Sequence, residues 1–218
     1  MHLEILIEDQ SGKHALAILL PKLLGEEHSW RIIAYKGIGH LPGNLQGGSD
    51  PERRMILNQL PRLLQGYGNT YPPGSDVAVL VVVDLDQRCQ KAFRQELLAL
   101  LQGCDPAPQT MFCLAVEELE AWYLGDRAAI LTAYPDAKKK ILNKYRQDSI
   151  CATWETVADA LYPGGAKALS QQGYPVVGRE KSLWAEKITP HMQPESNQSP
   201  SFAYFCQAVQ HLCRHKTS

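Results

Sequence analysis

The chain alternates short apolar segments with longer segments in which leucines recur at helical spacing. Four of the apolar segments are typical of β-strands and cover residues 3–7, 30–35, 77–83 and 110–116. The third of them, VAVLVVV, is an unbroken and mostly β-branched run. Such a run indicates a strand covered on both faces, which is typical of the centre of a parallel sheet.

Amphipathic segments lie between and after the predicted strands. They predict helices over residues 15–24, 51–65 and 87–101, and a helical turn or helix start over 117–124. Asp50 and Pro51 form a favourable N-cap and first-turn pair for the second helix, and the residues 66–76 that follow it predict a loop. The alternation of strand and helix predicts an α/β fold with a Rossmann-like, doubly wound, mainly parallel sheet of about four strands flanked by helices.

The character of the chain changes after about residue 130. A basic segment, KKKILNKYRQ, is followed by helical patterns over 153–162, 181–189 and 201–214. Gly- and Pro-rich stretches (PGGAK, QQGYPVVGRE and PESNQSPS) separate these patterns. We therefore predict an α/β core over residues 1–130 and a helical extension over 131–218 that packs on this core.

Composition and charge narrow the classes of function. The 218 residues are 44% hydrophobic and 21% charged, which is typical of a folded globular protein. Lys and Arg number 22 and Asp and Glu number 23, so the net charge is −1. A chain with this balance has no global positive field to attract nucleic acid or an anionic membrane. Any contact with nucleic acid must be local, bridged by metal or supplied by a partner.

Neither a membrane segment nor a disulfide framework is expected. The longest apolar run, Val77 to Val83, is far shorter than the roughly 20 residues that span a bilayer, and the N-terminus lacks the basic start of a signal peptide. The six cysteines form no CxxC pair, which favours reduced, packed thiols and makes zinc a minor alternative. These features predict a cytoplasmic protein.

Acidic side chains follow three of the four predicted strands. They are Glu8 and Asp9 after the first, Asp84 and Asp86 after the third, and Glu117, Glu118 and Glu120 after the fourth. The carboxyl ends of parallel strands meet at one edge of the sheet, where ligands bind. Carboxylates gathered there repel one another, so that one retains a proton or a cation neutralises them. Ligands that are all oxygen suit Mg²⁺ or Mn²⁺.

The spacing within these motifs refines the expected site. Strand alternation places Asp84 and Asp86 on the same side and turns the residue between them into packing. On a helix, Glu117 and Glu120 share a face, whereas Glu118 is expected to point into solvent. Each acid alone is equally well explained as a helix cap or a solvated side chain. For the set, we favour a metal site.

Basic residues offer further candidates for phosphate or nucleic-acid contact. Lys36 and His40 lie on a glycine-rich loop after the second strand, and Lys13 lies in the first turn of the helix after the first strand. This loop lacks the residue order of a P-loop, and a flexible polar loop is the simpler interpretation. Three consecutive lysines, Lys138, Lys139 and Lys140, are flanked by tyrosines, as in nucleic-acid strand contacts, although such a run more often forms a solvated helix face.

Several motifs carry a resemblance to a known group of proteins. The segments LIEDQSG, YKGIGHL, VVVDLDQ, EELEAWYLGD and WAEKITPHM…NQSPSF resemble a bacterial Toprim-like family of unknown function. That family is similar to proteins found beside ATPases in phage-defence or mobile loci. It is related to the Toprim domain of topoisomerases, primases and OLD-type nucleases, whose fold the resemblance implies.

The resemblance implies a role for each acid. Glu8 corresponds to the Toprim glutamate, which acts as general acid/base or metal ligand, and Asp84 and Asp86 correspond to the Mg²⁺ aspartates. Glu120, in ELEAW, would be a further site acid of the smaller family. The family usually has Gly where this chain has Asp9, which either disfavours the tight turn or adds a carboxylate.

Together these features favour a Mg²⁺- or Mn²⁺-dependent Toprim-type phosphodiesterase or nuclease, with weak unaided binding to nucleic acid and an ATPase as a partner. The metal ligands would be Glu8, Asp84, Asp86, Glu117 and Glu120. The alternative is a non-catalytic adaptor or regulatory subunit with the same fold. A receiver-like phosphoacceptor is a weaker third interpretation, because it leaves the helical extension and ELEAW without a role. The oligomeric state is left open.

Overall fold

The protein is an α/β structure built on one parallel sheet, as the sequence predicts. The structure is a computed structural model, and it describes residues 1–42, 55–149 and 152–214. Its four strands are β1 (His2–Ile7), β2 (Ser29–Ala34), β3 (Val77–Asp84) and β4 (Thr110–Ala115). All neighbours pair in parallel, in the order β2-β1-β3-β4.

The central position of β3 follows from its apolar composition. It pairs with β1 on one side and β4 on the other, and its residues from Ala78 to Val83 are buried. In the register between the two central strands, Ile7 of β1 lies opposite Val82 of β3. The strands therefore end close together, and Glu8, just after β1, and Asp84, the last residue of β3, come to the same edge of the sheet.

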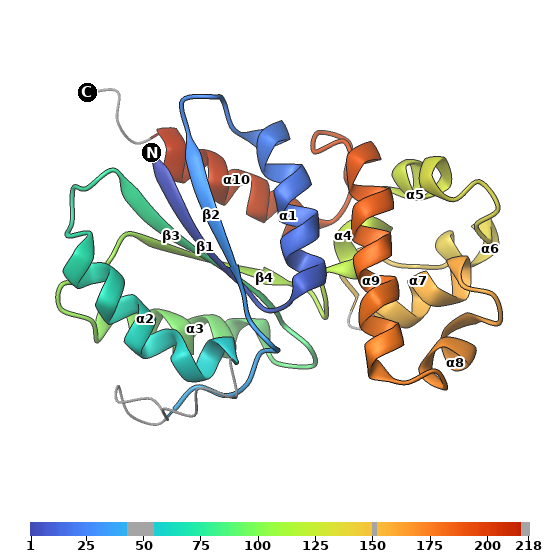
Figure 1. The fold of residues 1–218 in the computed structure, drawn as a ribbon, viewed down its shortest axis with the longest axis horizontal. Coiled ribbons are helices and arrows are strands. Elements are labelled where there is room, and N and C mark those ends of the chain that lie inside the picture. Colours follow the sequence, from blue (N-terminus) through green and yellow to red (C-terminus); the bar gives the residue numbers. More distant parts are fainter. Residues whose placement is uncertain (43–54, 150–151, 215–218) are drawn as a thin grey trace.

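Helices cover both faces of this sheet (Figure 1). The helices α1 (Gln10–Leu23) and α10 (Pro200–Arg214) share one hydrophobic cluster with β1, β3 and β4. The helices α2 (Ile56–Thr70) and α3 (Gln90–Gln102) share a second cluster on the opposite face. The sheet is thus a layer between two layers of helices, the arrangement expected of parallel strands joined by helical crossovers.

The remaining helices form a second lobe beside the sheet (Figure 1). They are α4 (Glu120–Leu124), α5 (Arg127–Ala133), α6 (Lys139–Leu142), α7 (Thr153–Leu161), α8 (Gly165–Ser170), α9 (Tyr174–Ile188) and the short η1 (Thr189–His191). The first hydrophobic cluster extends from the sheet into this lobe. Trp122 of α4, for example, packs on Phe202 and Phe205 of α10, with ring centroids 5.3 and 4.8 Å apart.

Several helix bounds differ from the prediction. The stretch QQGYPVVGRE was predicted to separate helices, but α9 begins within it at Tyr174, because Pro175 is compatible with the first turn of a helix. Two short helices, α5 and α8, were not predicted. The basic segment after residue 137 forms only the four residues of α6.

The second helix is displaced from its predicted range of 51–65. It begins at Ile56 and runs to Thr70, through glycines that were assigned to a loop. Gly68 is needed where α2 passes the loop before β4, because a Cβ there would lie 1.8 Å from the carbonyl oxygen of Pro106. The predicted N-cap pair, Asp50 and Pro51, lies outside the described residues.

Helices of membrane-spanning length and apolarity do not occur among the residues that the structure describes.

Candidate carboxylate site at the sheet edge

Two half-buried acids, Glu8 and Asp84, meet where the central strands end. The backbone N–H of Asp84 donates a hydrogen bond to Oε2 of Glu8 at 3.3 Å. Burial raises the pKa of Glu8 to about 7, and the negative charges of Asp86 and Asp9 add to the effect. Burial, and then the charge of Glu8, raises the pKa of Asp84 well above its ordinary value. The predicted convergence of Glu8 and Asp84 is therefore confirmed.

A lysine from α9 lies among the acids. The Nζ atom of Lys181 is 3.3 Å from Oε2 of Glu120 and 3.5 Å from Oε1 of Glu118. Burial lowers the pKa of Lys181, but the charges of Glu120, Glu118 and Asp84 outweigh it and raise this pKa well above its ordinary value. Lys181 is therefore charged, and it serves as the counter-ion of this end of the site.

Glu120 is the most deeply buried of these acids, with a residue exposure of 1%. Burial raises its pKa to about 7, in spite of the nearby charge of Lys181. Its Oε2 has no hydrogen-bond partner, because the 3.3 Å approach of Lys181 lacks the alignment of a hydrogen bond. The negative charge of Glu120 is thus only partly compensated by Lys181.

Asp86 lies outside the strand and does not sit next to Asp84 on the same face of it. The strand β3 ends at Asp84, and Asp86 adopts the left-handed conformation, with φ at 49°. Its carboxylate pairs with Nη1 of Arg88 at 3.1 Å. The argument from strand alternation is therefore wrong for Asp86, although its charge still acts on Glu8. The residue between the two acids, Leu85, is buried as predicted.

Glu117 caps a helix of the second lobe. It has a φ of 61°, and its carboxylate oxygens accept hydrogen bonds from the backbone N–H groups of Ala152 and Thr153 at 2.7 and 2.6 Å. The prediction that Glu117 shares a helix face with Glu120 is wrong, because α4 begins only at Glu120. The prediction that Glu118 is solvated is also wrong, since its carboxylate contacts Lys181.

Asp9 is the N-cap of α1. Its Oδ1 accepts a hydrogen bond from the N–H of Gly12 at 2.8 Å, and its φ of −145° is extended backbone that any residue adopts. The turn after β1 therefore does not require the glycine that is usual in the resembling family. The carboxylate of Asp9 is occupied by the cap, and its charge adds to the field on Glu8.

Only part of the predicted ligand set is suited to a cation in this arrangement. No group of three His, Cys, Asp or Glu side chains is placed to hold a metal ion within residues 1–42, 55–149 and 152–214. Glu8 and Asp84 nevertheless offer two adjacent carboxylates, and Mg²⁺ is commonly bound by one or two carboxylates together with waters. The other three predicted ligands are engaged elsewhere: Asp86 by Arg88, Glu117 by the start of α7, and Glu120 by Lys181.

Three basic candidates, Lys13, Lys36 and His40, lie on the segments that follow β1 and β2. Lys36 and His40 are exposed after β2, and the N–H of His40 donates to Oδ1 of Asn58 at 3.0 Å. Lys13 lies in the first turn of α1 and is half-buried.

The three consecutive lysines lie at the far end of the second lobe, away from the sheet (Figure 1). Lys138 donates to the carbonyl oxygen of Asp159 at 3.0 Å, and Lys139 and Lys140 are exposed on α6. Tyr145, which was expected to accompany them as a stacking ring, is buried. A solvated helix face describes these lysines better than a strand-binding surface.

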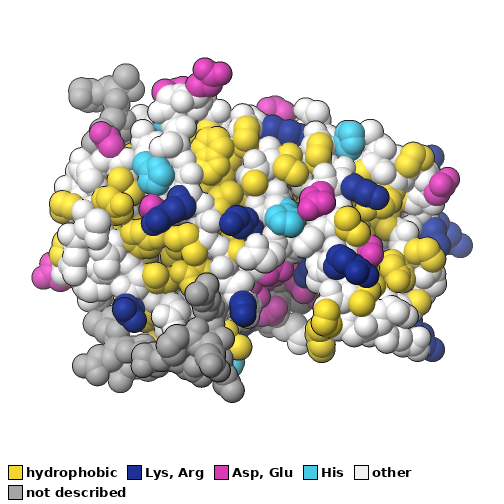
Figure 2. Space-filling view, viewed as in Figure 1, with side chains coloured by type: hydrophobic (Ala, Val, Ile, Leu, Met, Phe, Trp, Pro, Cys, Tyr) yellow, Lys and Arg dark blue, Asp and Glu magenta, His cyan; other side chains and the backbone are white. Residues whose placement is uncertain are grey.

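Two adjoining pockets lie beside the acids. A pocket of about 540 Å³ is lined by Lys181, Glu118, Trp154 and the exposed Tyr174, among others. A second one, of about 340 Å³, shares Glu118 and Trp154 with the first. Figure 2 shows acidic side chains gathered in a hollow between the sheet and the helical lobe. Charged groups of both signs thus face a space large enough for a small ligand.

The sequence alone gives Lys181 no role, because it lies far along the chain from the acids. It carries a signal that was available in the sequence, however. Trp184, Ala185 and Ile188 follow it at positions i+3, i+4 and i+7, and all three are buried. A lysine on the apolar stripe of a helix must face the core, where it requires carboxylate partners.

The fold and the site define a parallel α/β protein with paired acids at the carboxyl edge of its central strands. The chain belongs to a family described as a domain of unknown function, DUF4276, whose model matches residues 7–210. No curated protein and no solved structure matches the chain.

Proposed function

We propose that this protein is a divalent-metal-dependent phosphodiesterase that acts on nucleic acid, with Glu8 and Asp84 as the core of its site. The observation that carries the proposal is that the Glu8 carboxylate lies against the backbone of Asp84, where burial raises the pKa of both acids and the charge of Glu8 raises that of Asp84 further. Two like charges in a buried site require either a shared proton or a cation. Oxygen ligands favour Mg²⁺ or Mn²⁺.

The proposed roles follow from position and charge. When bound between Glu8 and Asp84, the cation would supply positive charge to a phosphoester oxygen and polarise the attacking water. Without a metal, burial raises the pKa of Glu8 to about 7, so a Glu8 that does not ligate the cation would accept or release a proton near neutral pH, as a general acid or base must. Lys181 holds Glu118 and Glu120 and adds a positive charge on the side of α9.

The charge of the chain bears on how a substrate reaches this site. With a net charge of −1 and acids around the pockets, the protein has little electrostatic attraction for a polyanion. We therefore propose that a basic partner delivers the nucleic acid. An ATPase in a defence system is the partner implied by the Toprim-like resemblance, and the chain would be its effector subunit.

A second candidate is a non-catalytic adaptor or regulatory subunit. It is favoured by the contacts of Lys181 and Arg88, which neutralise Glu120 and Asp86 without a metal. In that case the acids would serve packing and folding specificity.

Metal binding separates these candidates. We expect Mn²⁺ or Mg²⁺ at a hundred times its Kd to stabilise the wild-type protein by about 2.7 kcal/mol in thermal unfolding. Glu8→Gln and Asp84→Asn should abolish this effect, whereas Glu96→Gln, an exposed acid on α3, should keep it. Stabilisation that persists in the double variant Glu8→Gln/Asp84→Asn contradicts the proposed site.

Cleavage then tests the activity itself. Wild-type protein with Mn²⁺ should cleave at least one member of a panel of single- and double-stranded DNA and RNA, and the Glu8→Gln and Asp84→Asn variants should not. Metal binding without cleavage, with or without an ATPase partner, favours the adaptor.

A further inference from the structure

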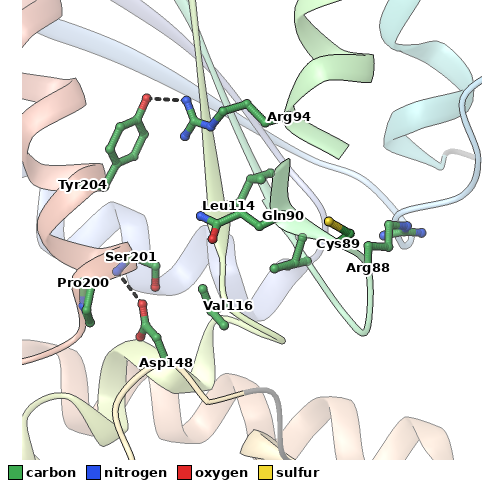
Figure 3. A pocket seen from close by; sticks show the side chains of 11 residues that line it. Arg88, Cys89, Gln90, Arg94, Leu114, Val116, Asp148, Pro200, Ser201 and Tyr204 are labelled. Atoms are coloured by element: carbon green, nitrogen blue, oxygen red, sulfur yellow. Dashed lines mark hydrogen bonds between the residues drawn. The ribbon is translucent and has the colours of Figure 1, made fainter. Parts of the chain in front are cut away.

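A pocket of about 400 Å³ adjoins the segment that follows β3 (Figure 3). Its apolar wall is formed by Leu85, Leu114 and Val116, from the ends of β3 and β4. Its polar wall comes from α3 and the residues just before it, from the start of α10, and from Asp148 in the loop after α6, and it includes Arg88, Gln90, Arg94, Ser201 and Tyr204. Leu85 separates Asp84 from Asp86, so this pocket and the carboxylate site share a border.

Two arginines line this pocket, and in Figure 3 the side chain of Arg94 lies over it, whereas that of Arg88 points away from its centre. Nη1 of Arg94 donates to the hydroxyl of Tyr204 at 2.9 Å, and its guanidinium lies 4.6 Å from the ring centroid. Nη1 of Arg88 donates to Asp86 at 3.1 Å, and its guanidinium lies 4.9 Å from the ring of Phe93. Each of these hydrogen bonds uses one of the five N–H donors that a guanidinium carries. Both groups are therefore held in position with donors to spare.

The acid in the lining, Asp148, does not neutralise these arginines by direct contact. Its Oδ1 accepts a hydrogen bond from the hydroxyl of Ser199 at 2.6 Å, and its Oδ2 accepts one from the N–H of Ser201 at 2.5 Å. Its charge therefore lies against the first turn of α10. The lining carries two positive charges and one negative charge, in a chain whose net charge is −1.

The pocket on the acidic side has the opposite character. It is lined by four carboxylates, those of Asp86, Glu117, Glu118 and Glu155. The ion pair between Asp86 and Arg88 thus stands between an acidic and a basic pocket. A phosphodiester strand that reaches Glu8 and Asp84 has further phosphates next to the one that reacts, and these need a cationic contact.

We propose that the arginine pocket binds a nucleotide phosphate, namely the phosphate next to the one that reacts at Glu8 and Asp84. The identity of the strand rests on the proposed function, whereas the phosphate chemistry rests on the pocket itself. Arginine binds phosphate through paired N–H donors, and Arg94 of α3 presents such a group in the pocket, while Arg88, just before α3, adds a second positive charge at its edge. The apolar wall and the ring of Tyr204 suit the sugar or base that accompanies the phosphate.

The test is binding to the metal-free protein, so that no cleavage is needed. The probes are inorganic phosphate, a mononucleotide and a short single-stranded DNA oligonucleotide, each titrated against wild type, Arg94→Gln and Arg62→Gln. Arg62 is an exposed arginine on α2 and serves as the charge-matched control. We expect Arg94→Gln to weaken binding of every probe at least tenfold and Arg62→Gln to leave it unchanged.

The salt dependence of oligonucleotide binding gives a second measurement, which would not change if Arg94 had only a structural role. Loss of one phosphate contact should reduce the slope of log K against log salt by about one in Arg94→Gln. Binding of the oligonucleotide more tightly than of the mononucleotide supports a strand as the ligand. Equal affinities instead identify a free nucleotide and overturn that part of the proposal.

Two further variants show whether Arg94 acts by binding phosphate or by its hydrogen bond to Tyr204, which connects α3 to α10. Tyr204→Phe removes the hydrogen bond to Arg94 but keeps the charge, and it should retain the affinity for phosphate. Arg94→Lys keeps a charge without the planar fork, and its affinity should lie between wild type and Arg94→Gln. A loss in Tyr204→Phe equal to that in Arg94→Gln overturns the proposal.

Failure of this proposal can be distinguished from failure of the proposed function. Phosphate binding that depends on Arg94, in a protein that neither binds metal nor cleaves, supports this pocket and rejects the phosphodiesterase. Metal-dependent cleavage with unchanged phosphate binding in Arg94→Gln rejects the pocket alone.

Discussion

At the scale of single residues, the site is defined by charges that are expensive to bury. Glu8, Asp84 and Glu120 all have pKa values raised first by burial, and Lys181 is the cation that α9 brings to them. Buried carboxylates with raised pKa values oppose folding once they ionise. Their retention beside a pocket is typical of a functional site, where such pKa values are concentrated.

Glu8 therefore makes stability dependent on pH. Its pKa is about 7 in the folded protein and near its ordinary 4.5 in the unfolded chain, so the folded state binds the proton more tightly between these values. Stability should fall as pH rises through this window, by up to about 1.4 kcal/mol per pH unit for this group. Glu8→Gln should flatten the dependence and, above pH 7, be more stable than wild type without metal.

Thermal unfolding of the metal-free proteins from pH 4.5 to 8 provides the measurement. Glu96→Gln is the control and should follow the wild-type curve. Glu120 contributes in the same direction, with a pKa of about 7, so some slope should remain in Glu8→Gln. A slope as steep as that of wild type would contradict the assignment to Glu8.

At the scale of helices and strands, the sequence predicts what depends on local pattern and not what depends on distant contacts. The four strands and the position of Glu8 next to Asp84 follow from apolar runs and parallel pairing, and they are confirmed. Asp86 and Glu117 were placed wrongly because both lie in left-handed turns, which alternation and helical spacing do not describe. The apolar stripe around Lys181 indicates that it faces the core, but its pairing with Glu120 depends on how the fold places α9 relative to α4.

The helix α2 gives a matched test of one such distant contact. Gly66 has open space where a Cβ would be, whereas a Cβ on Gly68 would meet the carbonyl of Pro106 at 1.8 Å. Gly66→Ala should raise the free energy of unfolding by about 0.5–1 kcal/mol, because alanine favours a helix. Gly68→Ala should lower it, since α2 and the loop must move apart. Chemical denaturation measures both, and equal effects would contradict the close approach.

At the scale of the whole molecule, the site lies where the sheet and the helical lobe meet. The acids come from the ends of β1 and β3 and from α4, whereas the lysine comes from α9, which packs on α1. The same hydrophobic cluster runs through both parts, from Leu16 beside the sheet to Val157 in α7. Charge pairing across this junction thus couples the position of α9 to the protonation of the acids.

This coupling predicts the effect of Lys181→Met. The variant leaves Glu120 buried without its counter-ion, and loss of one partner of a buried pair costs about 3–5 kcal/mol. The loss should be largest above pH 7, where Glu120 is ionised in wild type, and smaller at pH 5, where Glu120 is protonated. The double variant Lys181→Met/Glu120→Gln should recover most of the stability, because it removes the uncompensated charge. Denaturation curves at pH 5 and pH 8 measure the stability of wild type and of both variants. A loss of stability that is independent of pH and persists in the double variant would show that Lys181 acts through packing rather than through its charge.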